Sequence, residues 1–369
     1  MKKKIMFEIG SLSGGGAERV MVNLINHLDK KRYDILLLTH ENKNVYKKDL
    51  HSYIKIINLN KKSRLDFFKL ILKTMKIMRN YQPDAVLSML YYSNIIVLLA
   101  NLFLRRDYKI IISEHNYPRK YLPKSRLSYL KKYLMKLTYR KANSIVAVSE
   151  KIKRVLEEDF NVQSERIKTI YNPLPLEIIR SKSQKEVKDS FYKDKNAQVI
   201  ISVGRLIEQK RFDRLLRALA LVRKKNNSVR LIILGIGELQ KELETLASQL
   251  KINKWVDFVG FKSNPYAWIA KADIFVLSSD YEGFPMVILE AMACHVPVIS
   301  TDCPSGPGEI ISNGKNGMLV SPANEKALAD AMLTLLEDEN LRKKFSKNGR
   351  RRAKDFRIEK ILPKYEELF

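Results

Sequence analysis

Short apolar segments and amphipathic segments alternate along the first half of the chain. The apolar, β-branched runs predict strands at residues 5–9, 35–38, 54–59, 85–90, 109–113 and 145–148. Apolar residues at helical spacing predict helices that end near residue 28 and that span 64–81, 93–104, 127–141 and 149–159. This alternation is typical of a parallel sheet with helices on both faces.

The same pattern starts again after a break at residues 172–196, where two prolines interrupt any helix and a polar stretch follows. The second set of strands is predicted at 199–203, 230–234, 256–259, 274–277 and 296–300. The second set of helices is predicted at 211–225, 239–250, 286–294, 325–337 and 339–356. We therefore expect an α/β protein with two Rossmann-like, doubly wound domains, residues 1–180 and 181–356, that face a central cleft. The last segment, 357–369, is expected to cross back to the first domain.

The segment from Asp280 to Glu290 combines several features of a ligand site. A buried strand precedes it, a Gly-Phe-Pro loop lies in its middle, and Pro285 is expected at the first position of the following helix. A helix N-terminus presents unpaired N–H groups and a positive partial charge, which suit a phosphate. Glu282 lies in the loop, and Glu290 is expected about 7.5 Å along the helix axis from Pro285. Two glutamates eight apart are usually surface charges, but the strand and the loop favour a nucleotide-sugar site here.

Two further loops follow predicted strands and carry candidate phosphate ligands. Arg205 and Lys210 could neutralise a diphosphate, although 68 of the 369 residues are Lys or Arg and a basic pair is common by chance. The glycine-rich loop at 14–16 opens the first helix, and Gly16 would let the backbone approach a phosphate. The loop matches neither G-x-G-x-x-G nor a Walker motif, which argues against a dinucleotide oxidoreductase or a P-loop enzyme.

A single histidine, His115, follows the strand at 109–113. A lone histidine is more often structural, but its place at the carboxyl end of a strand makes it a candidate site residue. The chain contains no Asp-x-Asp pair, which is the usual way to hold a metal–diphosphate. We therefore expect no metal and no cofactor, with the diphosphate charge balanced by Arg, Lys and a helix N-terminus.

Composition adds a strong positive charge and few cysteines. The formal net charge is +28, so nucleic acid, an anionic membrane and phosphorylated substrates are all candidate partners. Cys294 and Cys303 form no C-x-x-C pair and are expected to be free thiols in the cytosol. The longest apolar run, 95–104, is interrupted by Asn101 and is too short to span a bilayer. The protein is expected to be soluble or peripheral.

The predicted helix at 64–81 places its lysines on one side. Lys69, Lys73 and Lys76 fall within an arc of roughly 60°. The other side is expected to pack on the first domain through its apolar residues Leu65, Phe68, Ile71, Leu72, Met75 and Met78. A solvated lysine face is the simpler interpretation. The alternative is that these lysines bind the phosphates of a lipid-linked acceptor or the headgroups of an anionic membrane.

As a set, these motifs resemble those of the retaining glycosyltransferases of family 4, which have the GT-B fold. Glu282 and Glu290, separated by seven residues, match the family signature. The other matching segments are Gly-Gly-Ala-Glu-Arg at 15–19, Gly-Arg at 204–205 with Lys210, Glu-His at 114–115, and Ser-Gly-Pro-Gly-Glu at 305–309. The resemblance covers nearly the whole chain in the right order. The chain departs from it at 172–175, where many members carry an Asn-Gly turn.

The resemblance implies that both domains contribute to a nucleotide-sugar site. Glu290 would bind the donor ribose and Glu282 the hydroxyls of the donor sugar. The side chains of Arg205 and Lys210 would hold the diphosphate. The backbone amides of Phe284, Met286 and Val287 would assist them. From the first domain, Gly16 would approach the distal phosphate and His115 would contact the sugar near the reacting carbon.

We therefore expect a metal-independent transferase that moves a hexose or N-acetylhexosamine from a nucleoside diphosphate, expected to be UDP, to a lipid-linked glycan with retention of configuration. The leaving phosphate would take the acceptor proton, because no carboxylate is placed as a nucleophile. The expected role is bacterial cell-surface polysaccharide or glycoconjugate synthesis, at the cytoplasmic face of the membrane and in peripheral contact with anionic lipid. One alternative is an epimerase or phosphorylase of the same architecture. A basic nucleic-acid-binding protein is disfavoured, because no aromatic strand platform or known module is present.

Overall fold

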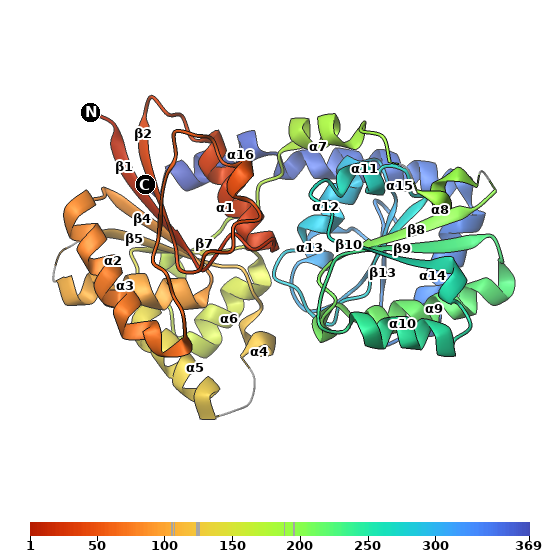
Figure 1. Cartoon of the computed structure of the whole chain (residues 1–369), viewed down its shortest axis with the longest axis horizontal. Helices are drawn as coiled ribbons and strands as arrows, with labels where there is room; N and C mark the ends of the chain where they lie inside the picture. Colours follow the sequence, from red (N-terminus) through yellow and green to blue (C-terminus); the bar gives the residue numbers. More distant parts are fainter. Residues whose placement is uncertain (105, 107, 123–125, 188, 195) are drawn as a thin grey trace. The chain divides into compact units, whose positions relative to one another are not determined.

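The computed structural model describes residues 1–104, 106, 108–122, 126–187, 189–194 and 196–369. It divides into two compact units (Figure 1). The first unit consists of Met1–Pro173 and Ile358–Phe369, and the second of Leu174–Arg357.

The first unit is built on a seven-stranded parallel sheet with the strand order β3-β2-β1-β4-β5-β6-β7. Its strands are β1 (Lys3–Ile9), β2 (Tyr33–Thr39), β3 (Lys55–Asn58), β4 (Ala85–Met89), β5 (Lys109–Glu114), β6 (Ser144–Ala147) and β7 (Ile167–Thr169). The four central residues of β1 that pair with both β2 and β4 are buried, because helices cover both faces of the sheet.

Helices lie on both faces of this sheet (Figure 1). One face carries α2 (Phe67–Tyr81), α3 (Tyr91–Leu104) and α5 (Arg126–Tyr139), which pack side by side in that order. The other face carries α1 (Gly16–His27) and α16 (Ile358–Glu366), which pack on each other. The unit is completed by α4 (Pro118–Tyr121), α6 (Glu150–Phe160), η1 (Lys47–Asp49), η2 (Arg64–Asp66) and η3 (Ser164–Arg166).

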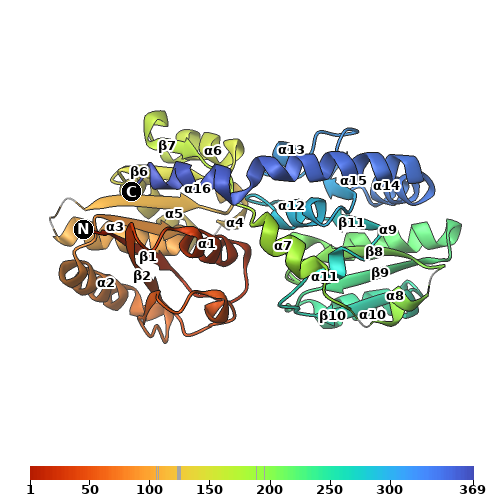
Figure 2. The same cartoon turned by 90° about the horizontal axis from the view of Figure 1, so that it is seen from above.

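The C-terminal segment of the chain belongs to the first unit. The ring of Phe369 lies 6.0 Å from the ring of Phe7 on β1 and 6.0 Å from the ring of Tyr33 on β2. Figure 2 shows the two chain ends, marked N and C, on this same unit. The aromatic contacts explain why the last twelve residues fold with the first part of the chain.

The second unit contains a six-stranded parallel sheet with the order β10-β9-β8-β11-β12-β13. Its strands are β8 (Gln198–Val203), β9 (Val229–Leu234), β10 (Val256–Gly260), β11 (Ile274–Leu277), β12 (Val298–Thr301) and β13 (Met318–Val320). Its longer helices are α7 (Leu176–Ser183), α9 (Phe212–Lys225), α10 (Gln240–Gln249), α12 (Met286–Ala293), α14 (Glu325–Glu337) and α15 (Glu339–Ala353). The short ones are α8 (Ser190–Lys193), α11 (Tyr266–Ile269), α13 (Pro307–Ile310), η4 (Glu208–Lys210), η5 (Asn253–Trp255) and η6 (Lys354–Phe356).

The helices of the second unit also cover both faces of the sheet. On one face α9 packs against α10 and α14, and on the other α12 packs against α15 (Figures 1 and 2). Leu215, Leu219 and Val222 recur at helical spacing on α9 and are fully buried, which places the apolar stripe of that helix in the core. The residues from 174 to 183 join this unit because α7 packs on α11 and α12.

The two parallel sheets confirm the predicted α/β class, but several details differ from the sequence prediction. β7 and β13 were not predicted, because each has only three residues. The predicted apolar side of the helix at 64–81 is only partly correct, because Ile71 and Met78 are buried but three of the predicted residues are exposed. Leu65, Phe68 and Leu72 are 90%, 73% and 64% exposed. Apolar residues surround most of α2, so periodicity alone did not identify the buried face, which is formed by Leu70, Ile71, Thr74 and Met78.

Candidate functional site

Glu282 lies in the loop between β11 and α12, and its side chain is almost completely buried. Two donors share one of its oxygens. The Lys210 ammonium lies 2.6 Å from Oε1, and the Ser279 hydroxyl donates to the same atom at 2.6 Å. No described residue donates to Oε2. The carboxylate is therefore fixed through one oxygen, and the other can accept a hydrogen bond from a ligand hydroxyl.

The loop that carries Lys210 is tied to the loop that carries Glu282. Lys210 ends η4, and its backbone carbonyl accepts a hydrogen bond from the Ser278 hydroxyl at 2.8 Å. The neighbouring Gln209 donates from its side-chain amide to the carbonyl of Tyr281 at 2.8 Å. These bonds make the two loops one unit, so the ion pair between Lys210 and Glu282 does not depend on flexible side chains alone.

A third segment supports the turn into α12. The hydroxyl of Ser305 donates to the carbonyl of Gly283 at 2.7 Å. Gly306 has φ +92°, and a Cβ at this position would lie 2.4 Å from Cδ of Pro285. Only glycine fits such a close approach. The segment thereby holds the backbone that leads to Met286, the first residue of α12, and Pro285 occupies the N-cap rather than the predicted first helical position.

Glu290 lies on the second turn of α12 and is almost completely buried. The Tyr266 hydroxyl donates to its Oε1 at 3.3 Å. Burial, together with the charge of Glu290, raises the pKa of the nearby Cys294 thiol to about 12. Cys294 is therefore a neutral thiol at physiological pH and is not a candidate nucleophile.

Arg205 lies on the loop after β8, beside the elements just described. β8 and β11 are neighbours in the sheet, so the loops at their carboxyl ends lie on the same edge. Gly235, with φ +146°, makes this arrangement possible, because a Cβ there would lie 1.8 Å from the carbonyl oxygen of Gly204. Arg205 is exposed, and its side chain forms no hydrogen bond or ion pair with another residue in the described part of the chain. Its guanidinium is thus available for an anionic ligand.

In the first unit, the two candidate residues follow strands β1 and β5, which lie on either side of β4 in the sheet. Gly16 is the first residue of α1, the helix after β1, and His115 directly follows β5. His115 is 8% exposed, and its Nε2 lies 3.0 Å from the hydroxyl of Ser113. Burial lowers the pKa of His115 to about 3, so the imidazole is neutral at physiological pH. Its Nδ1 is buried and has no hydrogen-bond partner among the described residues.

Comparison with known sequences covers both units. The family described as "Glycosyltransferase Family 4" matches residues 14–178, and the one described as "Glycosyl transferases group 1" matches residues 183–352. An N-acetylgalactosamine-N,N'-diacetylbacillosaminyl-diphospho-undecaprenol 4-alpha-N-acetylgalactosaminyltransferase of Campylobacter jejuni is 34% identical over 366 residues, which cover 97% of each chain. The chain belongs to glycosyltransferase family 4. It is a retaining glycosyltransferase with the GT-B fold.

Two further comparisons agree with this assignment of the glycosyltransferase. A second C. jejuni relative, GalNAc-alpha-(1->4)-GalNAc-alpha-(1->3)-diNAcBac-PP-undecaprenol alpha-1,4-N-acetyl-D-galactosaminyltransferase, is 31% identical and covers 99% of this chain and 98% of its own. Among solved structures, Anabaena Alr3699/HepE in complex with UDP and glucose superimposes with a TM-score of 0.82 over 99% of this chain and 98% of that chain. At 21% identity this likeness shows the shared fold.

The structure of the glycosyltransferase brings most of the predicted site residues together on one edge of the second sheet. They are Arg205, Lys210, Glu282, Phe284, Met286, Val287 and Glu290. The sequence did not reveal three supporting hydrogen bonds. Ser279 donates to Glu282, Tyr266 donates to Glu290, and Ser305 donates to the carbonyl of Gly283. Ser279 and Tyr266 belong to no recognisable motif, so only the folded chain reveals them.

The lysine side of α2 is only partly free. Lys69 and Lys76 are exposed, whereas the Lys73 ammonium donates to the backbone carbonyl of Leu59. Within the described residues no helix is long and apolar enough to cross a bilayer, and no group of three or more His, Cys, Asp or Glu side chains could hold a metal.

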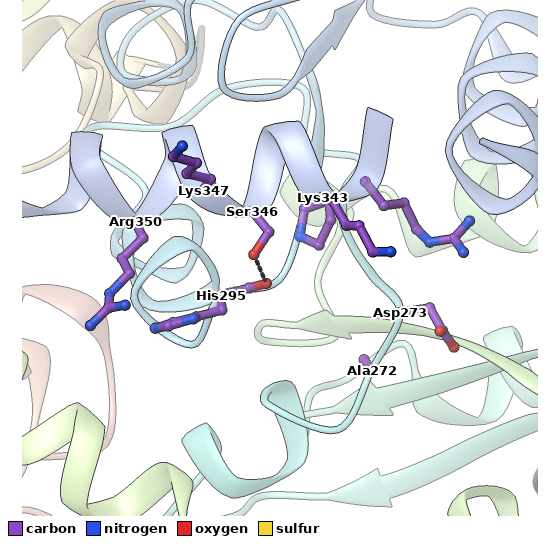
Figure 3. A pocket seen from close by; sticks show the side chains of 9 residues that line it. Ala272, Asp273, His295, Lys343, Ser346, Lys347 and Arg350 are labelled. Atoms are coloured by element: carbon purple, nitrogen blue, oxygen red, sulfur yellow. Dashed lines mark hydrogen bonds between the residues drawn. The ribbon is translucent and has the colours of Figure 1, made fainter. Parts of the chain in front are cut away.

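A cationic hollow of about 470 Å³ lies elsewhere on the second unit (Figure 3). Asp273 and Pro297, which line it, precede β11 and β12. The hollow therefore lies at the amino ends of these strands, whereas Glu282 and Arg205 follow the carboxyl ends. The other charged residues around it come from α15, among them Lys343, Lys347 and Arg350. We conclude that this hollow is separate from the candidate donor site.

Proposed function

We propose that this glycosyltransferase transfers a hexose or N-acetylhexosamine from a UDP-sugar to a lipid-linked glycan, in the synthesis of a bacterial cell-surface polysaccharide or glycoconjugate. Two relatives that cover nearly the whole chain are named as N-acetylgalactosaminyltransferases acting on glycans linked to diphospho-undecaprenol. Two of the structures with this fold contain UDP with glucose and UDP-glucose. These names support the substrate classes, and the residues of this chain supply the mechanism.

The ion pair between Lys210 and Glu282 is the observation that carries the proposal. A buried carboxylate with one oxygen fixed and the other free suits a sugar hydroxyl. The ammonium beside it, together with Arg205, suits the diphosphate that leaves with the nucleotide. Lys210, between the Glu282 carboxylate and the proposed diphosphate position, can stabilise the negative charge that grows on the diphosphate as the glycosidic bond breaks.

The remaining donor contacts come from α12. The backbone N–H groups of Met286 and Val287 at its first turn, and that of Phe284 just before it, would bind a phosphate oxygen. A helix N-terminus carries a positive partial charge that favours such an anion. Glu290, oriented by Tyr266, would accept the ribose hydroxyls.

His115 would contact the donor sugar as a neutral imidazole. Its depressed pKa keeps it uncharged, and Nδ1 is left for a ligand hydroxyl because Nε2 is paired with Ser113. Gly16 would approach the distal phosphate through its backbone. A Cβ at this position would contact no protein atom, so the close approach of a ligand is the reason we propose for a glycine here. The leaving phosphate would take the proton of the acceptor hydroxyl, and no metal is needed in this account.

The acceptor and the membrane would meet α2. Lys69 and Lys76 would bind acceptor phosphates or anionic headgroups, and Lys73 could join them only by leaving the carbonyl of Leu59. The exposed side chains of Phe68 and Leu72 on the same helix would enter the interfacial region of the bilayer. This combination of exposed apolar and basic residues supports a peripheral contact at the cytoplasmic face.

The donor class can be tested with a panel of UDP- and GDP-sugars. The purified enzyme should release UDP, and not GDP, in the presence of a lipid-linked oligosaccharide acceptor. A Lys210→Gln variant should lose most of this release, while Lys347→Gln in the separate hollow should release UDP like the parent. Equal release from both nucleotides, or from both variants, would contradict the proposed donor site.

A further inference from the structure

Glu114 is the last residue of β5 and directly precedes His115. Its side chain is completely buried, yet its carboxyl group receives hydrogen bonds from two different elements. The Tyr139 hydroxyl, on α5, donates to Oε2 at 2.8 Å, and the backbone N–H of Asn116 donates to Oε1 at 3.2 Å. The second bond closes the turn that contains His115.

The donor on α5 is itself held in place. The Asn94 side-chain amide donates to the Tyr139 hydroxyl at 3.3 Å and to the carbonyl of Ser113 at 3.1 Å. Its oxygen accepts a hydrogen bond from the Ser88 hydroxyl at 2.8 Å. A buried network thus connects α5 and α3 to the end of β5, and Glu114 is its contact with the loop of His115. Such networks fix one arrangement when every member is satisfied.

The charge state of Glu114 changes near neutral pH. Burial raises its pKa to about 7, and the hydrogen bonds from Tyr139 and from the backbone of Asn116 oppose this rise. The titratable groups that face it are Tyr139 from α5, Tyr121 from α4 and His115 in the loop. Burial raises the pKa of both tyrosines and lowers that of His115, so these three groups stay neutral at pH 7.

We propose that Glu114 is a positioning residue, which fixes the loop of His115 through Asn116 and links it to α5 through Tyr139. The inference rests on the proposed contact between His115 and the donor sugar. The ionised carboxylate holds Asn116 and Tyr139 by charge-assisted bonds, which are about twice as strong as neutral ones. Protonation weakens both bonds, so the placement of His115 and the turnover number follow the ionisation of Glu114.

The test combines kinetics with a measurement that needs no turnover. In the parent enzyme, kcat should rise as the pH increases through about 7, and the amide resonance of Asn116 should titrate over the same range. Glu114→Gln should remove both titrations and lower kcat at pH 8 on the order of ten-fold, below the about 100-fold that a 1 Å misplacement can cost. The KM for the UDP-sugar should stay within about two-fold of the parent value.

Tyr139→Phe offers a sharper check, because it removes one bond that lowers the pKa of Glu114. The midpoints of both titrations should shift to higher pH. Tyr81→Phe is the matched control, since it removes a 2.8 Å hydrogen bond from another tyrosine of this unit to the carbonyl of Asp34, at the start of β2. This control should leave both midpoints unchanged.

Thermal unfolding provides a second measurement. The folded state binds the Glu114 proton more tightly than the unfolded chain, so the contribution of Glu114 to the free energy of unfolding should fall as pH rises from about 4.5 to 7. Glu114→Gln should lack this fall.

Two results would overturn the inference. One is a parent-like pH profile of kcat in Glu114→Gln while His115→Ala loses activity, which would leave the proposed function intact. The other is an Asn116 amide that does not titrate in the parent enzyme, whether or not sugar is transferred. Absence of transfer by the parent with every donor would instead contradict the proposed function, and the amide titration would still decide the role of Glu114.

Discussion

At the scale of single residues, the site depends on charges that are buried in pairs. The Lys210 and Glu282 side chains are only 14% and 8% exposed, so either one alone would be a poorly solvated charge. Glu290, which is also nearly buried, accepts a hydrogen bond from the Tyr266 hydroxyl at 3.3 Å. The two glutamates are thus placed for different tasks although both are nearly buried.

The different surroundings of the two glutamates predict different kinetic effects. Glu282→Ala should mainly lower kcat, because it removes the group proposed to bind the reacting sugar. Glu290→Ala should mainly weaken UDP binding, by about 1.5–3 kcal/mol, as expected for a hydrogen bond to a charged group. Steady-state kinetics and calorimetric titration with UDP would measure both. Glu242→Ala on the exposed side of α10 is the control, and parent-like behaviour of both site variants would place the donor elsewhere.

His115 predicts an acid-sensitive stability. Its pKa is about 3 in the folded state and 6.5 in the reference state, so the unfolded chain binds more protons between these values. The contribution of His115 to the free energy of unfolding should therefore be complete above pH 6.5 and should decrease as the pH falls towards 3. His115→Asn should reduce this decrease, and the exposed His51→Asn should not. Denaturant titrations across this pH range would show it, and equal pH dependence in both variants would contradict the buried, neutral state of His115.

At the scale of elements, α2 is the helix whose surface does not match an ordinary solvated face. Its exposed side carries two lysines and two large apolar residues, Phe68 and Leu72. Large exposed apolar residues on one helix mark an interaction surface. On the far side of α3, α5 exposes Leu130 and Tyr133, so exposed apolar side chains occur on two helices of this face.

Two sets of substitutions on α2 separate the electrostatic from the apolar contribution. Lys69→Gln with Lys76→Gln should raise the acceptor KM and weaken vesicle binding by about 2 kcal/mol, roughly 30-fold, because each basic residue near an anionic surface contributes about 1 kcal/mol. The donor KM should not change. Lys344→Gln with Lys347→Gln on α15 is the charge-matched control, and co-sedimentation with anionic vesicles is the measurement. An equal loss of vesicle binding in the control would show that only the net charge of the protein matters, and not the position of these lysines on α2.

The apolar contribution can be measured in the same assay. Phe68→Ser with Leu72→Ser should weaken vesicle binding even at high salt, where electrostatic attraction is screened. Thermal stability should change little, since both side chains are exposed in the folded enzyme. Unchanged vesicle binding would contradict a contact of Phe68 and Leu72 with the bilayer.

The same elements show what a sequence can predict. Glu282, Glu290 and the strand before them follow an apolar pattern and a fixed spacing, so the main part of the candidate donor site could be proposed from the sequence. The face of α2 was not, because apolar residues occur on several of its sides and tertiary contacts chose among them. Ser279 and Tyr266 reach the two glutamates from positions that no spacing rule connects to them, and β13 is too short to give a pattern.

At the scale of the whole molecule, the chain carries a net charge of +28 and no Asp-x-Asp pair. We propose that positive side chains replace a metal at the diphosphate. Activity should therefore survive EDTA, while Arg205→Ala should reduce it sharply. Loss of activity on chelation that manganese or magnesium restores would contradict this division of roles.

The most direct test of the central claim is to follow one sugar from donor to acceptor. The enzyme should be incubated with a UDP-N-acetylhexosamine and a lipid-linked oligosaccharide, and the products analysed by mass spectrometry and NMR. The account predicts an acceptor extended by one sugar, with the anomeric configuration of the donor retained, and an equal amount of UDP. Free sugar released without extension of the acceptor, or a product with inverted configuration, would contradict it.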